Sequence, residues 1–421
     1  MNSVSPVLKE RLRAIFGVEI EPEPAVRRII ADVRDRGDAA LFVYSLKIDG
    51  VEFTSLEVSG EQITNAYSLV TEELISALRF AAERIRSFHS AQKSAIWREA
   101  SQPDVGWLIR PLQRVGVYAP GGTACYPSSV LMTAIPAKVA GVEEVVLVTP
   151  PGPEAAVPAP TLVAADIAGV SRVFCVGGAQ AIAALAYGTE SIPRVDKICG
   201  PGNIFVVLAK KLVYGAVDID GLQGPSEVVI VADETADPGY CAADLLAQAE
   251  HDSLASAILI TTSSRLADAV NQEVERQVAG LPRKAVIAEA IEQRGMIVVV
   301  DTIEEALELV NLYAPEHLWL MVKNAATYID KVANAGAVFV GQNSTVVLGD
   351  YVAGPSHVLP TGGTARFSSP LNVSSFIKFI NLVNMSEVGL IQLAHAASTI
   401  ARVEGFDAHV QAIERRLGTT E

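Results

Sequence analysis

The sequence predicts an α/β protein built from two parallel-sheet units. Short β-branched runs alternate with helical segments from about residue 118 onward, and this alternation is typical of parallel sheets covered by helices. It occurs in two blocks, 118–226 and 227–345, which we interpret as two α/β units. The length of 421 residues is typical of two to three domains, and 50% hydrophobic residues are enough to fill large cores.

Two helical segments are expected before the first block, at residues 24–47 and 60–95. Ser59 and Gln62 are spaced as a capping box at the start of the second segment. Apolar residues then recur at helical spacing, at Leu74, Leu78, Ala81 and Ile85.

The first block is expected to contain three strands and two helices. The strands are Val145–Thr149, Arg172–Val176 and Val195–Cys199, and the helices are 160–168 and Ala179–Tyr187.

The second block repeats the pattern with four strands and three helices. The strands are Val228–Ala232, Ala257–Thr261, Met296–Val300 and Ala337–Val340, and the helices run from Pro238 to about His251, over Ser264–Val278 and over Ile303–Tyr313. Asp237 followed by Pro238 is an N-cap with proline at the first helical position. Beyond residue 370 we expect two helices, Ser375–Val383 and one from Ser386 to about Val403.

Charge and cysteine content narrow the possible partners. The formal net charge is −15, which argues against binding nucleic acid or an anionic membrane. We find no signal-peptide pattern at the start of the chain and no apolar run of about 18 residues. Four widely spaced cysteines form no CxxC pair. This indicates a reducing compartment, and we expect a cytoplasmic location.

Four of the six histidines stand near a carboxylate or an amide in the C-terminal part of the chain. The pairings are His251 with Gln248 and Glu250, His317 with Glu316, His357 seven residues after Asp350, and His409 five residues after Glu404. Histidine titrates near neutrality and is the commonest metal ligand, and a neighbouring carboxylate can share its proton or complete a metal shell. The four pairings together predict one assembled site.

Taken singly, each pairing has a plainer interpretation. Gln248 and His251 share a face of a predicted helix and are compatible with a solvated surface. Glu404 and His409 lie near the C-terminus, where polar residues are usually solvated. The segment 349–366 is the most unusual, because glycine, proline and hydroxyl residues surround one Asp, one His and one Arg. Long irregular loops of this kind are usually functional.

Glycine-rich turns at 119–124, 176–181 and 199–203 suggest a phosphate ligand. None of them is a GxGxxG motif or a P-loop. The pair Gly177-Gly178 does lie between a predicted strand and a predicted helix, where helix-terminal N–H groups can bind a pyrophosphate.

These segments together resemble the histidinol dehydrogenase family over residues 20–415. The resemblance rests on stretches that occur in this order: Tyr-Ala-Pro-Gly-Gly-Thr-Ala (118–124), Pro-Ser-Ser-Val-Leu-Met (127–132), the glycine-alanine run 176–189, Val-Asp-Lys-Ile-Cys-Gly-Pro-Gly-Asn (195–203), Gly-Pro-Ser-Glu-Val (224–228), Gln-Ala-Glu-His (248–251), Ala-Pro-Glu-His-Leu (314–318) and the loop 349–366.

The resemblance implies a fold of two incomplete Rossmann-like parallel-sheet units with small helical N- and C-terminal extensions. It implies an N-terminal extension (1–17), a catalytic and metal-binding domain (18–117 with 227–370), an NAD-binding domain (118–226) and a C-terminal helical tail (371–421) that packs on a partner subunit. The family is a homodimer, so the active site would lie between subunits.

The resemblance also implies roles for individual residues. One Zn²⁺ per subunit would be bound by Gln248, His251, Asp350 and His409. Glu316 and His317 would transfer protons. NAD⁺ would be bound at Tyr118, Gln180 and Asn203. Substrate would contact the four zinc ligands, His317 and three further residues, Ser226, His357 and Glu404.

The activity implied is the four-electron oxidation of L-histidinol, through L-histidinaldehyde, to L-histidine, the end of histidine biosynthesis. Two departures from the family pattern, Ile219–Ser226 and Ser356, lie near the substrate residues. Three alternatives therefore stay open: a related NAD-dependent dehydrogenase of another polar alcohol such as a sulfonated diol, a zinc hydrolase using Glu316, and a non-catalytic binding protein.

Overall fold

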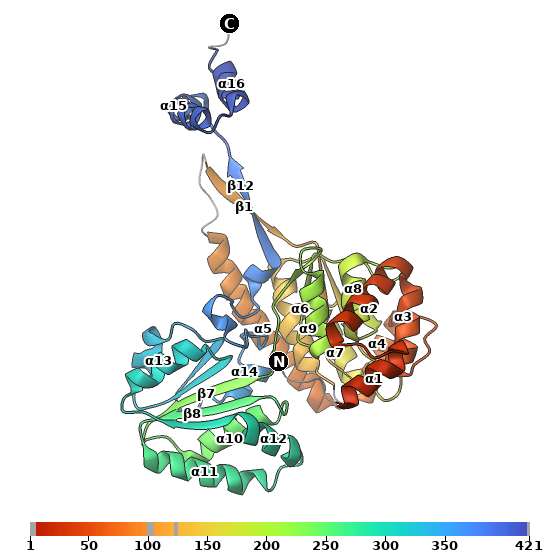
Figure 1. Ribbon diagram of the computed structural model, residues 1–421, viewed down its shortest axis with the longest axis vertical. Coiled ribbons are helices and arrows are strands. Elements are labelled where there is room, and N and C mark those ends of the chain that lie inside the picture. Colours follow the sequence, from red (N-terminus) through yellow and green to blue (C-terminus); the bar gives the residue numbers. More distant parts are fainter. Residues whose placement is uncertain (1–5, 99–104, 122–124, 419–421) are drawn as a thin grey trace.

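Two five-stranded parallel sheets form the centres of two domains, as predicted (Figure 1). The computed structural model describes residues 6–98, 105–121 and 125–418. Residues 122–124 of the first glycine-rich turn lie outside these ranges. No helix in the described ranges is long and apolar enough to cross a lipid bilayer.

The first sheet has the strand order β4-β3-β2-β5-β6. Its strands are β2 (Arg114–Tyr118), β3 (Glu144–Thr149), β4 (Arg172–Cys175), β5 (Lys197–Cys199) and β6 (Asp218–Ile219), and its own helices are α6 (Pro127–Ala140), α7 (Ala159–Ala168), α8 (Gly178–Tyr187) and α9 (Ile204–Val213). Successive strand residues point to opposite faces. Val145 and Leu147 thus pack with α6 and α7, and Val146 and Val148 with α8 and α9.

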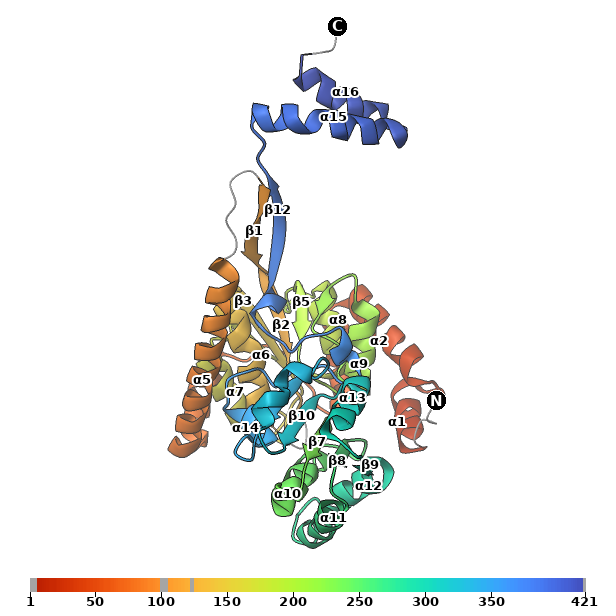
Figure 2. The ribbon, with the colours of Figure 1, turned by 90° about the vertical axis from the view of Figure 1, so that its left-hand side faces the viewer.

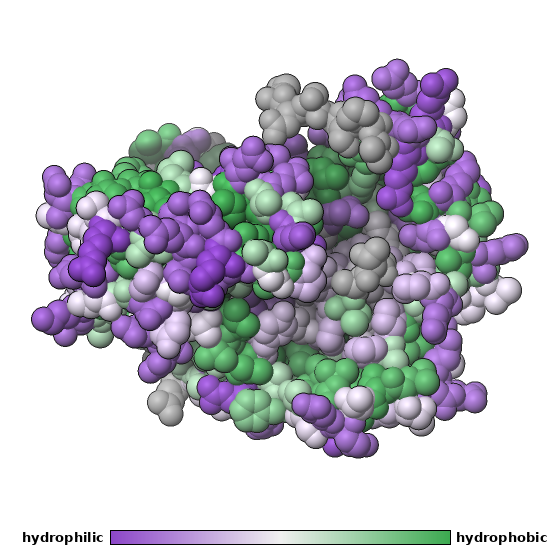
Figure 3. All heavy atoms as spheres, turned by 90° about the horizontal axis from the view of Figure 1, so that it is seen from below, coloured by the Kyte–Doolittle hydropathy of each residue, from purple (hydrophilic) through white to green (hydrophobic). Residues whose placement is uncertain are grey.

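The second sheet has the strand order β11-β10-β7-β8-β9. Its strands are β7 (Glu227–Ala232), β8 (Ser256–Thr261), β9 (Gly295–Val299), β10 (His317–Met321) and β11 (Ala337–Val340), and its helices are α10 (Pro238–Ala249), α11 (Ser264–Val278), α12 (Lys284–Arg294), α13 (Ile303–Tyr313) and the 3₁₀ segment η3 (Ala325–Lys331). One face of β7 and β8 packs with α10 and α11, and the other with α13. Seen from below, a recess separates the two domains (Figure 3).

The N-terminal helices pack on the first sheet's domain. They are α1 (Pro6–Phe16), α2 (Pro22–Arg36), α3 (Asp38–Tyr44), η1 (Ser45–Asp49), α4 (Gly60–Ala66), η2 (Tyr67–Leu69) and α5 (Glu72–Arg98). Val26 and Leu41 join the apolar cluster of α8 and α9, and Ile85 joins that of α6 and α7. The predicted division, which grouped residues 18–117 with 227–370, stays a prediction.

Both predicted N-terminal helices are interrupted. Gly37, at φ 54°, ends α2 before α3 begins. The capping box of Ser59 and Gln62 is present at α4. The second segment breaks at η2, after which the hydroxyl of Thr71 accepts the N–H of Leu74 in the first turn of α5.

The C-terminal region starts as part of the body and then leaves it. It comprises α14 (Val346–Tyr351), the 3₁₀ segments η4 (Thr364–Arg366) and η5 (Val373–Phe376), β12 (Ile377–Val383), α15 (Glu387–Val403) and α16 (Asp407–Arg416). β12 pairs antiparallel with β1 (Val105–Pro111). The pair leads away from the two sheets, so α15 and α16 stand apart from the rest of the chain (Figures 1 and 2).

The predicted helix Ser375–Val383 is wrong, because most of that segment is β12. Its strand state depends on pairing with β1, which lies more than 260 residues earlier in the chain and was not predicted. The other strands and helices for which no range was predicted are β2, β6, β10, α1, α6, α9, α12, α14 and α16. The remaining predicted strands and helices are confirmed to within two or three residues at their ends.

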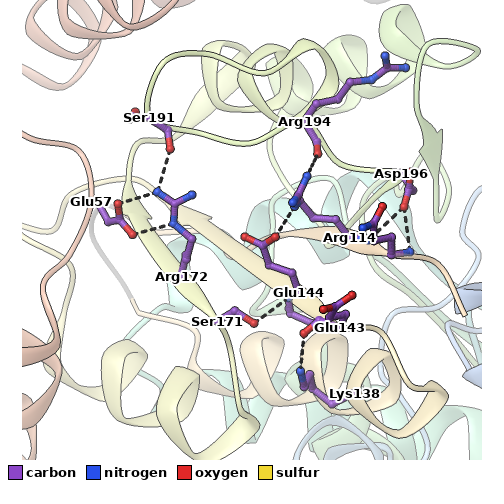
Figure 4. Close-up of polar contacts among 12 residues, drawn as sticks. Glu57, Arg114, Lys138, Glu143, Glu144, Ser171, Arg172, Ser191, Arg194 and Asp196 are labelled. Atoms are coloured by element: carbon purple, nitrogen blue, oxygen red, sulfur yellow. Dashed lines mark hydrogen bonds and ion pairs between the residues drawn. The ribbon is translucent and has the colours of Figure 1, made fainter.

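Structural ion pairs occupy the amino ends of the first sheet's strands (Figure 4). Arg114 pairs with Glu144 and donates to the carbonyl of Arg194. Arg172 binds Glu57 through two hydrogen bonds of 2.8 and 2.7 Å. The candidate cofactor residues lie at the opposite, carboxyl end of this sheet.

Candidate active site

Glu316 and His317 are buried where β10 begins. Both are clamped to the start of the neighbouring strand β7. The Glu316 carboxylate accepts the backbone N–H of Glu227 at 2.9 Å, and the Glu227 carbonyl accepts a hydrogen bond from Nδ1 of His317 at 2.9 Å. A carbonyl can only accept, so Nδ1 carries a proton and the other ring nitrogen, Nε2, is left for chemistry.

Nε2 of His317 faces a carboxylate from another element. It lies 3.6 Å from Oδ1 of Asp350, and it has no hydrogen-bond partner among the residues that the structure describes. Asp350 lies near the end of α14. A Cβ on the preceding residue, Gly349, would stand 2.6 Å from the Phe339 ring on β11. Glycine at 349 thus allows α14 to approach the sheet closely.

A cavity of about 490 Å³ opens beside this pair. His317, Asp350 and His357 line it, together with β11 and the loop after α14. Nδ1 of His357 donates a hydrogen bond to the backbone carbonyl of Asp350 at 2.7 Å. The hydroxyl of Ser356 donates to the carbonyl of Met132 in α6 at 3.0 Å, so this loop is anchored to the first domain.

Burial and close charges shift the pKa values of the site in different directions. Burial raises the pKa of Glu316 to about 7, although the charge of His317 opposes the shift. Burial alone would lower the pKa of His317, but the Glu316 and Asp350 carboxylates raise it to about 9. Burial opposes the ionisation of Asp350, and the contact with His317 outweighs it and lowers its pKa. Burial lowers the pKa of His357.

Three of the four predicted zinc ligands come from adjacent elements. Thr345, just before α14, donates to Asp244 of α10 at 2.6 Å. Gln248 is one turn beyond Asp244 on the same helix face and is buried. The charge of His251 acts on Asp350 and on His357.

The donor set fits a zinc ion in its chemistry. An amide oxygen, an imidazole nitrogen and a carboxylate oxygen are ligands of the borderline type that Zn²⁺ accepts. Within the described part of one chain, however, no three His, Cys, Asp or Glu side chains gather into a metal-binding group.

The remaining predicted ligand, His409, lies on α16, and the predicted substrate residue Glu404 lies at the end of α15. Both are exposed. Figures 1 and 2 show these two helices well away from the sheets of the same chain. The structure thus does not bring them together with Glu316 and His317 in one chain. Ser226, by contrast, directly precedes β7, and its carbonyl accepts the N–H of Ser256 at 2.9 Å.

The three predicted cofactor residues gather at the carboxyl end of the first sheet. Tyr118 ends β2, and its hydroxyl accepts the N–H of Gly178 at 3.1 Å. Gln180 is fully buried in α8, and neither polar atom of its amide has a partner among the described residues. Asn203 caps α9 by accepting two backbone N–H groups. The crevice beside β2 and β5 is where strand order reverses, the usual ligand position in such sheets.

Two residues that support these sites were not predicted from the sequence. Glu227 supplies the backbone groups that hold Glu316 and His317. Its only signal in the sequence is a charged residue at the start of an apolar strand. Lys210 is 1% exposed and donates to the Gly200 carbonyl at 3.0 Å, which fixes the turn before Asn203. Its signal is a lysine inside a largely apolar helix.

An acid–base pair at one parallel sheet and a glycine-turn crevice at the other define a two-domain α/β enzyme. Comparison with known proteins identifies its family. The histidinol dehydrogenase family model matches residues 18–417. Histidinol dehydrogenase of Dehalococcoides mccartyi strain CBDB1 is 55% identical over 97% of this chain and 94% of its own length. That of Streptococcus mutans is 48% identical, over 99% and 97%.

A solved structure agrees with these matches. The crystal structure of histidinol dehydrogenase from Elizabethkingia anophelis has a TM-score of 0.90 and 37% identity, covering 99% of this chain and 97% of that one. The chain belongs to the histidinol dehydrogenase family. It is an oxidoreductase enzyme of histidine biosynthesis, which excludes the hydrolase and the non-catalytic binding protein.

Proposed function

We propose that the protein oxidises L-histidinol, through L-histidinaldehyde, to L-histidine, with zinc bound and two NAD⁺ reduced in turn. The observation that carries the proposal is the buried pair of Glu316 and His317, 3.6 Å apart, of which His317 lines one cavity together with Asp350. Alcohol oxidation releases the hydroxyl proton, and aldehyde oxidation consumes a water. Two proton acceptors of different strength suit these two steps.

Zinc would be held by Gln248, His251 and Asp350 of one subunit and by His409 of the other. When bound, it supplies a Lewis acid and fixes the orientation of the substrate. The proximity of Asp350 to His251 and the buried amide of Gln248 support this assignment. The position of α16, which carries His409 and stands away from the sheets of its own chain, supports the intersubunit part.

NAD⁺ would bind at Tyr118, Gln180 and Asn203. When bound, it supplies the hydride acceptor. The unpartnered amide of Gln180 supports a ligand at this place, because a buried amide without hydrogen bonds costs about 1–3 kcal/mol.

His317, in its neutral form, would accept the substrate's hydroxyl proton at Nε2; because its pKa is raised to about 9, the fraction of this form increases as the pH rises toward 9. Its Nδ1 bond to the Glu227 carbonyl keeps the ring in the tautomer and orientation that expose Nε2. Glu316 would take a proton from the water that attacks the aldehyde. Its carboxylate is held by the Glu227 N–H, and burial strengthens it as a base.

Substrate would be oriented by the zinc ligands together with Ser226, His317, His357 and, from the partner, Glu404. Helices α15 and α16 stand beyond the β1–β12 pair, and α15 exposes apolar side chains such as Ile391 and Ile400; both features support a homodimer in which each tail completes the other subunit's site. Four free cysteines support a cytoplasmic location.

A substrate panel tests the proposal. L-Histidinol, other amino alcohols and sulfonated diols are each supplied with NAD⁺, and NADH formation is followed. We expect L-histidinol to have the highest kcat/KM and to yield two NADH per molecule. A preference for a sulfonated diol would support the alternative dehydrogenase, for which the sequence departures at 219–226 and 356 are the motivation.

A further inference from the structure

A second cavity adjoins the candidate cofactor residues. It measures about 270 Å³, and Gly178, Gln180 and Asn203 form one side of it. Helix α1 forms the other side through Leu8, Arg11, Leu12, Ile15 and Phe16. The family match begins at residue 18, so this wall comes from a helix that precedes the matched region.

Two independent features indicate that the cavity takes a ligand. The amide of Gln180 is fully buried, lines the cavity and has no hydrogen-bond partner among the described residues. The ten-residue helix α8 also begins at the cavity, at Gly178, whose N–H is bound by the Tyr118 hydroxyl, and its N-cap residue, Gly177, has no side chain to cap the following N–H groups. The first N–H groups of a helix attract an anion.

Arg11 brings a positive charge to the same cavity. Its Nη2 donates to the carbonyl of Ile48 at 3.3 Å, and its charge acts on the Asp49 carboxylate. A guanidinium has five N–H donors in a planar fork. One long bond to a carbonyl therefore leaves capacity for a phosphate, which is the stronger acceptor.

We propose that α1 is the outer wall of the dinucleotide site and that Arg11 binds the dinucleotide's pyrophosphate. The proposal rests on the proposed use of NAD⁺. The apolar side chains Leu8, Leu12 and Phe16 cover the ligand, and Arg11 with the start of α8 neutralises its two phosphates. Arg11 thereby becomes an affinity-determining residue outside the matched family region.

Binding measurements on the full-length protein test this. Dissociation constants for NAD⁺, ADP-ribose and adenosine are measured by calorimetry for the wild type, Arg11→Gln and Arg13→Gln. Arg13 is the matched control, because it is on the same helix, is exposed and lies outside the cavity lining. We expect Arg11→Gln to weaken NAD⁺ and ADP-ribose roughly tenfold, as for one charged hydrogen bond. Adenosine binding and the Arg13→Gln variant should be unchanged.

Hydrogen exchange of α1 gives a readout besides affinity. NAD⁺ should slow amide exchange over residues 6–16 in the wild type and less so in Arg11→Gln, while thermal melting confirms that both are folded. Equal affinities of the Arg11 and Arg13 variants, with no protection of α1, would overturn the inference and leave the proposed function intact. A wild type that binds neither NAD⁺ nor ADP-ribose would overturn the proposed cofactor and this inference together.

Discussion

The two ring nitrogens of His317 have different surroundings, and this difference sets what the residue can do. Nδ1 donates to a backbone carbonyl of β7, and Nε2 faces Asp350 at 3.6 Å. The parallel register pairs His317 with Val228, so Glu227 lies opposite Glu316. The backbone N–H and C=O of Glu227 therefore reach the side chains of Glu316 and His317. Peptide groups of a strand are rigid, and they preorganise the pair without a further side chain.

Replacing Glu316 should separate the two oxidation steps. Glu316→Gln keeps the shape of the side chain but removes the base that would activate water. We expect aldehyde oxidation to fall about 10²–10⁴-fold and alcohol oxidation to fall less. NADH formation from L-histidinol and from L-histidinaldehyde, compared in single turnovers, checks this.

The control is Glu308→Gln, an exposed carboxylate on α13, which should leave both steps unchanged. An equal loss in the two steps for Glu316→Gln would contradict the assignment of water activation to this residue.

Removal of metal should abolish activity. Gln248, His251 and Asp350 offer a borderline N/O donor set of the kind that Zn²⁺ binds. Exhaustive chelation should give an inactive protein with less than about one tenth of a zinc per subunit, and added Zn²⁺ should restore turnover. Elemental analysis of both samples accompanies the assay, and full turnover in a metal-free sample would refute zinc dependence.

The sequence indicated the side chains of the candidate site, but it did not indicate the hydrogen bonds that hold them in place. Adjacent Glu316 and His317 before an apolar run indicated a functional pair. The support from Glu227 comes through its backbone, which every residue type shares, so no sequence pattern could reveal it. Ser356 stood out as a departure from the family, and its bond to Met132 depends on tertiary contact.

Helix α9 illustrates how an element positions a site from a distance. Lys210 and Asp220 form an ion pair with side chains only 1% and 2% exposed. Asp220 also accepts the N–H of Gly200 at 2.7 Å, and Lys210 donates to Gln223 at 2.9 Å. The network fixes the turn from Gly200 to Asn203. The position of Asn203, a candidate cofactor residue, therefore depends on the buried side chain of Lys210, about two helical turns further along α9.

Breaking this network should destabilise the protein strongly. Lys210→Met leaves the Asp220 carboxylate buried without its partner, which costs about 3–5 kcal/mol. The neighbouring Lys211→Met removes only an exposed contact of 3.9 Å with Glu23, worth at most about 1 kcal/mol. Urea denaturation followed by circular dichroism measures both free energies of unfolding. A Lys210→Met loss no larger than that of Lys211→Met would show that the buried pair is not stabilising.

Elements with strong local signals were predictable, and those defined by partners were not. The strand-helix alternation identified both sheets because buried parallel strands are continuous apolar runs. Segment 377–383 becomes a strand only because β1 lies beside it. In α6, ten of fourteen residues are buried. Its sequence therefore has little of the amphipathic pattern by which a helix is predicted.

At the scale of the molecule, the two domains contribute opposite ends of their sheets. Tyr118 stands at the carboxyl end of β2, as expected for an α/β sheet, whereas His317 and Glu227 stand at the amino ends of β10 and β7. Strand polarity relative to the other domain is a property of the assembled fold. The sequence alone therefore predicts two sheets, but it does not predict which end of the strands in each sheet carries the candidate site.

We expect His409, on the C-terminal tail, to complete the site of the other subunit. Exposed apolar side chains on α15, including Ile391, Leu393 and Ile400, need a partner surface, and exchange of an element between protomers is a common route to a dimer. Subunits with His251→Ala and subunits with His409→Ala should each be inactive alone. Refolded together, mixed dimers hold one site with both defects and one intact site, so random pairing should restore about a quarter of wild-type activity. Tagged subunits report that exchange took place, and a mixture that exchanges yet stays inactive would place His409 outside the partner's site.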